Sequence, residues 1–141
     1  MLFRSQIFHI RTSDDTFFNS ANRLTLEYFN HKYSQEVKIL KENVESNDFI
    51  ITNNTEFKTG LAEYYPQYTI SKLDTCHIGL PNLNHKAIRD TLVEFFIMTK
   101  SSKIKTYSHY DWISGYANRV ADIYDIPINN LREKNENNIL S

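Results

Sequence analysis

Strand-like segments alternate with segments of helical spacing along this chain, and this alternation limits the folds that the chain can adopt. Apolar or alternating runs predict strands at 5–11, 49–54, 67–73 and 103–108. Apolar residues at helical spacing predict helices at 17–33, 55–65, 85–101 and 111–125. Strands that alternate with helices favour a parallel sheet that is covered on both faces. We therefore predict an α/β fold with a Rossmann-like parallel sheet of about four strands.

The length and charge of the chain limit its organisation and its partners. A chain of 141 residues favours one domain, which we assign to 1–128, followed by a polar C-terminal tail at 129–141. Polar loops are predicted at 41–48 and 74–84. The net charge of −1 gives no general attraction to polyanions, so no nucleic-acid partner is expected.

Cysteine content and hydrophobicity indicate the compartment. The single cysteine, Cys76, excludes an internal disulfide and fits a reducing cytoplasm. The N-terminus "MLFRSQIFHI" lacks the apolar core of a signal peptide. The longest apolar run, "FFIM", is too short to span a bilayer. We expect a cytoplasmic protein with no integral membrane segment.

Charged residues gather where the first predicted strand ends. The segment "FHIRTSDD" places His9 and Arg11 on one face of that strand, at the edge where open parallel sheets bind ligands. Arg11 offers a fork of donors suited to phosphate, next to a predicted helix N-terminus. The alternatives are a surface ion pair of Arg11 with Asp14 or Asp15, and a half-buried His9 that bonds a backbone carbonyl. The two aspartates can also cap the helix.

A second polar segment, "YSHYDWISGY", follows the last predicted strand. Ser108 and Asp111 can cap the next helix, while Ser114 and Gly115 allow a ligand to approach the backbone closely. A Ser-His-Asp triad is disfavoured because the segment lacks a G-x-S-x-G elbow.

Two further arrangements of titratable residues were weighed. Asp90 and Glu94 lie at i, i+4, and ordinary surface pairing beside Arg89 is the favoured interpretation. A metal site built from three histidines is disfavoured because their spacing matches no zinc pattern. Those histidines are His77, His85 and His109.

Three stretches resemble a known family. "FHIRTSDD" is similar to a His-x-Arg-x-x-Asp motif, and 89–124 is similar to that family's second block, with "SGYA" at its turn into the last helix. Over about 5–127 the chain resembles the C-terminal, nucleotide-sugar-binding half of GT-B glycosyltransferases, nearest to the α-1,2/α-1,6-fucosyltransferase-like group.

The resemblance implies roles for particular residues. Arg11 would contact the β-phosphate of a GDP-sugar and stabilise the leaving group, with His9 beside the same pocket. The implied nucleotide-binding residues also include Asp14, Asp90, Ser108, Ser114, Gly115 and Tyr116. The implied reaction is metal-independent, inverting transfer of a sugar, typically fucose, to a glycan, with the nucleotide sugar as co-substrate and no cofactor.

The resemblance also implies a partner, because a GT-B enzyme binds its acceptor on a second domain. We expect a homo-oligomer or a separate acceptor-binding domain or subunit, with an exposed aromatic patch as the contact. The candidate patch residues are Tyr64, Tyr65, Tyr107, Tyr110 and Trp112.

Two other functions stay open. One is a non-catalytic α/β binding or interaction module, including a degenerate or truncated relative of the family. The other is a different α/β enzyme, such as a hydrolase, for which Cys76 and Ser108 are the candidate nucleophiles.

Overall fold

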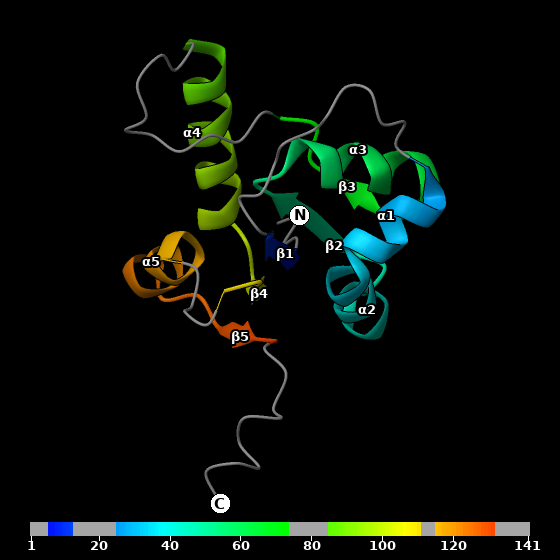
Figure 1. The fold of residues 1–141 in the computed structure, drawn as a ribbon. Coiled ribbons are helices and arrows are strands. Elements are labelled where there is room, and N and C mark those ends of the chain that lie inside the picture. Colours follow the sequence, from blue (N-terminus) through cyan, green and yellow to red (C-terminus); the bar gives the residue numbers. More distant parts are fainter. Residues whose placement is uncertain (1–5, 13–24, 74–84, 111–114, 132–141) are drawn as a thin grey trace, which may run out of the picture.

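Helices and strands alternate in the computed structural model, which describes residues 6–12, 25–73, 85–110 and 115–131 (Figure 1). In chain order the elements are β1 (Gln6–Arg11), α1 (Leu26–Lys32), α2 (Ser34–Asn43), β2 (Asp48–Thr52), α3 (Thr55–Tyr64), β3 (Thr69–Ile70), α4 (His85–Thr99), β4 (Lys103–Ser108), α5 (Gly115–Tyr124) and β5 (Ile128–Asn130). The part of the predicted helix 17–33 that precedes residue 25 lies outside the described residues.

The strands form one parallel sheet in the order β3-β2-β1-β4-β5. This confirms the predicted α/β fold, with a fifth strand added. From β1 the chain adds β2 and then β3 on one side of the sheet. It then returns and adds β4, followed by β5, on the other side of β1. The strand order therefore reverses between β1 and β4, which is the topological switch point where Rossmann-like sheets bind ligands.

Helices cover both faces of the sheet, as predicted (Figure 1). One face packs against α1, α2 and α3 through a core that includes Phe8, Phe29, Leu40 and Phe57. The opposite face packs against α4 and α5 through a core of Ile7, Ile51, Met98, Ile104, Ala117, Val120, Ala121 and Ile126. Because strand side chains alternate between faces, β1 contributes Phe8 to the first core and Ile7 to the second.

Local signals explain where several helices begin and end. The side chains of Thr25 and Asn54 accept hydrogen bonds from backbone amides in the first turns of α1 and α3, at 3.1 Å and 3.0 Å. Pro66 follows α3 and cannot extend it. After α5, Asp125 adopts φ 55°, and the amide of Ile126 bonds the Ala121 carbonyl at 3.0 Å. This left-handed residue closes the C-terminus of α5.

Three predicted segments have different bounds in the structure. The predicted loop at 41–48 begins with the last turn of α2, a helix whose many polar residues obscure its apolar face. The predicted strand at 67–73 pairs only over Thr69–Ile70. Residues 128–130, which span the predicted boundary of the tail, form β5. Its sequence is rich in asparagine, which is rare in strands, and backbone pairing with β4 overrides that low propensity.

The α4 helix lies with an unexpected side against the sheet. Its predicted apolar stripe is partly exposed, since Leu92 is 47% and Phe96 is 61% exposed. Asp90 and Glu94 are buried instead, so the interpretation of surface pairing for these carboxylates is wrong. Glu94 accepts a 2.5 Å hydrogen bond from the hydroxyl of Ser71, which gives this carboxylate a buried partner.

The predicted aromatic patch does not form as expected. Tyr107 is buried, and Tyr64 and Tyr65 pack against the core beside α1–α3. Tyr110 is half-buried, and Trp112 lies outside the described residues. Tyr124, which follows the apolar spacing of α5, is 47% exposed. Among the described residues, the large exposed apolar side chains lie mainly on α4 and α5.

Candidate anion-binding site

Arg11 lies at the switch point of the sheet. It is the last residue of β1, and its register partner is Ser108, the last residue of β4. The amide of His109 donates to the Arg11 carbonyl at 2.8 Å, so the backbone pairing continues past both strand ends. The Arg11 guanidinium lies 5.5 Å from the centre of the Tyr110 ring, a cation–π contact. A half-buried, planar cation therefore sits at the edge where this fold binds ligands.

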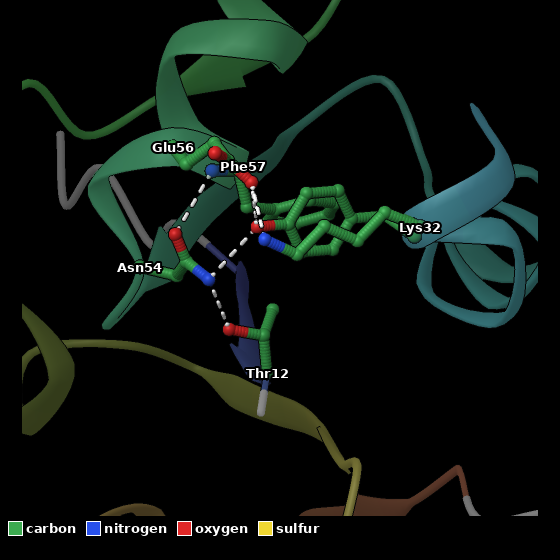
Figure 2. A network of polar contacts seen from close by, with 6 residues as sticks. Thr12, Lys32, Asn54, Glu56 and Phe57 are labelled. Carbon is green, nitrogen blue, oxygen red and sulfur yellow. Dashed lines mark hydrogen bonds and ion pairs between the residues drawn. The ribbon is translucent and has the colours of Figure 1, made fainter. Parts of the chain in front are cut away.

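The residue after Arg11 is held by two asparagines from the end of β2. The side-chain oxygen of Asn53 accepts from the Thr12 amide at 3.1 Å. The Asn54 side-chain amide donates to the Thr12 hydroxyl at 2.9 Å, and its oxygen caps α3 by accepting from Phe57 (Figure 2). Both the backbone and the side chain of Thr12 are thus fixed, which restricts the position of Arg11 one residue earlier.

The same contacts continue into a buried network on the α1–α3 side (Figure 2). Asn54 also donates to the Tyr33 hydroxyl at 3.1 Å, and Tyr33 donates to the Glu56 carboxylate at 2.7 Å. Lys32 donates to the same carboxylate at 2.8 Å. Burial, and then the neighbouring Glu56 carboxylate, raise the pKa of Tyr33. Tyr33 therefore stays a neutral donor, and this network supplies rigidity at the strand ends.

His9 lies on the opposite, α4–α5 face of the sheet. Its Nδ1 is 3.1 Å from the hydroxyl of Thr106, its register partner on β4. Its ring centre is 5.8 Å from that of Tyr116. Burial, and then the positive charge of Arg11, lower the pKa of His9 to about 4. His9 is therefore neutral near pH 7, and its hydrogen-bond partner is a hydroxyl rather than a backbone carbonyl.

Gly115 and Tyr116 begin α5 beside His9. The Tyr116 hydroxyl donates to the Thr91 carbonyl of α4 at 3.2 Å, and burial, followed by Glu94, raises the pKa of Tyr116. Gly115 is exposed, and a Cβ added there would meet nothing within 4 Å. Packing within the protein thus does not require glycine at this position, and the backbone is open to approach.

Of the remaining predicted site residues, Ser108 lies beside Arg11 and Asp90 lies on α4. Asp90 is buried on α4 and accepts a 2.8 Å hydrogen bond from Lys86. Ser108 is buried, and its hydroxyl accepts from the Tyr110 amide at 3.2 Å. Asp14 and Ser114 lie outside the described residues. The structure thus gathers His9, Arg11, Ser108 and Tyr116 around the ends of β1 and β4.

Sequence reasoning missed the residues that support this group. Neither Thr106 nor Asn53 belongs to a recognisable sequence motif. Asn54 could have been found, because an asparagine three residues before Phe57 at the start of a helix is a capping signature.

Among the described residues, no group of three or more His, Cys, Asp or Glu side chains is placed to hold a metal ion. His77, one of the three histidines weighed above, lies outside that part of the chain. None of the helices in the described ranges is both long and apolar enough to cross a bilayer.

Comparisons with family models, with curated proteins and with solved structures find no match for this chain.

Proposed function

We propose that this chain is a nucleotide-sugar-binding domain of the glycosyltransferase type. The observation that carries the proposal is the position of Arg11 at the switch point between β1 and β4. The donor in this proposal is a GDP-linked sugar, fucose-like, and the acceptor is a glycan held by a second domain, a partner subunit or another copy of the chain. The proposed location is the cytoplasm.

The chemistry of Arg11 suits a diphosphate. A guanidinium can donate two parallel hydrogen bonds to phosphate oxygens, and its charge persists at every physiological pH. Burial of the arginine stem strengthens such contacts because the local dielectric is lower than that of water. In sugar transfer, negative charge develops on the leaving diphosphate, and a fixed cation stabilises that charge without a metal ion. The proposed enzyme is accordingly metal-independent and inverting.

The environment of His9 favours a second candidate, a module that binds a nucleotide sugar without turning it over. His9 is buried, neutral near pH 7 and hydrogen-bonded to Thr106. A general base must reach the acceptor hydroxyl at hydrogen-bond distance. In the described geometry His9 instead supports the strand ends, so turnover would need a base from another domain or subunit.

The first experiment is calorimetric titration of the purified chain with GDP, UDP, ADP and CMP. We expect GDP to bind most tightly, and Arg11→Ala to weaken it about 10- to 100-fold through loss of charge-assisted hydrogen bonds. Arg11→Lys should recover only part of the affinity because lysine lacks the planar fork. The matched control is Arg89→Ala, which removes an exposed arginine on α4.

The outcomes separate the candidates. Failure of all four nucleotides to bind, or equal binding by wild type and Arg11→Ala, would overturn the proposal. If GDP binds, the chain is incubated with GDP-fucose and released GDP is detected. Release that is lost in Arg11→Ala supports the transferase, whereas stable binding without release is expected both of a binding module and of a donor domain without its acceptor-binding partner.

A further inference from the structure

Charge is segregated across α4, independently of the candidate site. Both acidic side chains of this helix, Asp90 and Glu94, face inward and are buried. Its basic side chains Lys86 and Arg89 are exposed, as is Lys100 directly after the helix. The outer side of α4 therefore carries positive charge only, although the net charge of the chain is −1.

The same outer side carries large apolar residues. Leu92, Val93 and Phe96 of α4 are 47%, 40% and 61% exposed, and Ile123 and Tyr124 of α5 are 65% and 47% exposed. We call these five residues the α4–α5 face. Phe95, a half-buried residue of α4, connects the two helices. Its ring centre is 6.0 Å from that of Phe96 on α4 and 6.2 Å from that of Tyr124 on α5. Both helices cover the side of the sheet opposite α1–α3 (Figure 1).

Cations flank the α4–α5 face. Arg89 lies seven residues before Phe96, which places it on the same side of α4, and the exposed Lys100 directly follows the helix. Arg119 lies four residues before Ile123 on α5. Within the described part of the chain, none of these three cations forms an ion pair.

Two exposed acidic residues lie near the end of α5. Asp122 and Asp125 line a hollow with Ile126 and Ile128, next to β5. Asp122 lies three residues after Arg119 and offsets part of its charge, so the positive charge beside the α4–α5 face comes mainly from Arg89 and Lys100.

We propose that the α4–α5 face docks on an anionic lipid surface. Apolar side chains ringed by arginine and lysine match the requirements of such a surface, because the apolar groups enter the headgroup–acyl boundary and the cations reach lipid phosphates. This inference does not depend on nucleotide binding.

The test is flotation of the full chain with vesicles of phosphatidylcholine alone and of phosphatidylcholine with phosphatidylserine. We expect binding only to the vesicles that contain phosphatidylserine, with loss of binding at high salt. Leu92→Ser and Arg89→Glu should each weaken binding several-fold, and the double variant about tenfold or more.

Two control variants are matched to these changes. Leu26→Ser alters a leucine on α1 with the same exposed fraction, 47%, on the other side of the sheet. Lys38→Glu makes the same charge reversal on an exposed residue of α2. Both controls should bind like wild type. Circular dichroism confirms that every variant is folded, which is expected because all four residues are exposed.

Three results would overturn the proposal. The first is failure of the wild type to bind vesicles that contain phosphatidylserine. The second is equal weakening by the control variants. The third is a concentration-dependent dimer in sedimentation that Leu92→Ser abolishes while lipid binding is unchanged, which would assign the α4–α5 face to a second copy of the chain.

Discussion

At the scale of single residues, His9 shows how burial changes the chemistry of a side chain. The folded state holds its pKa at about 4, compared with 6.5 for an unperturbed histidine. Between these values the unfolded chain binds more protons, so the stability that His9 contributes is complete above pH 6.5 and is lost as the pH falls through 4. A shift of this size corresponds to about 3 kcal/mol. We expect His9→Gln to remove that pH dependence.

Chemical denaturation measures the free energy of unfolding of wild type and of His9→Gln between pH 4 and pH 7.5. The test is the difference between the two curves of unfolding free energy against pH. The difference is needed because Glu36 also titrates. Burial raises the pKa of Glu36 despite the nearby His109. The stability that Glu36 contributes is therefore lost as the pH rises, whereas that of His9 is lost as the pH falls. Parallel curves for the two proteins would show that His9 is not held neutral by the fold.

At the scale of elements, the contact between α1 and α3 depends on one glycine. A Cβ at Gly60 would lie 2.2 Å from the Phe29 ring, which is fully buried between the two helices. The ring also stacks on Phe57 at 5.6 Å and has little room to move. We expect Gly60→Ala to lower the free energy of unfolding by about 1–3 kcal/mol through overpacking, despite the better helix propensity of alanine.

Urea unfolding measures this change, with Gly115→Ala as the matched control. A Cβ at Gly115 has open space, so this variant should be neutral or slightly stabilising. If Gly60→Ala were as stable as wild type, α1 would not pack on α3 as the structure shows.

The side of α4 that faces the sheet was not predictable from the helix alone. Its apolar spacing predicted the helix, but the inward side of α4 includes Glu94, whose buried carboxylate is hydrogen-bonded by Ser71. Ser71 directly follows β3 and lies 23 residues before Glu94 in the chain. The spacing of apolar residues within a helix cannot predict such a distant partner.

At the scale of the whole molecule, β5 completes one edge of the sheet. The Ile104 amide donates to the Pro127 carbonyl at 2.9 Å, and the Leu131 amide donates to the Thr106 carbonyl at 2.8 Å. A chain that ends at residue 127 would lose most of this pairing and expose the edge of β4. We expect it to be about 1–3 kcal/mol less stable and to aggregate more readily than a chain that ends at residue 131.

Thermal unfolding and light scattering of the two shortened chains provide the comparison. Equal stability and solubility would show that the domain ends at 128, as the sequence alone predicted. A clear deficit in the shorter chain would place the boundary after β5.

Local sequence patterns predicted the α/β class, the approximate positions of four strands, and the location of Arg11 at a strand end. These features depend on local periodicity and turn chemistry, which short segments carry on their own. Long-range contacts set the order β3-β2-β1-β4-β5, the hydrogen bonds that hold Thr12 to Asn53 and Asn54, the inward side of α4, and the pairing of β5. Each of these depends on partners far apart in the chain, and burial of polar groups against such partners overrides local pattern.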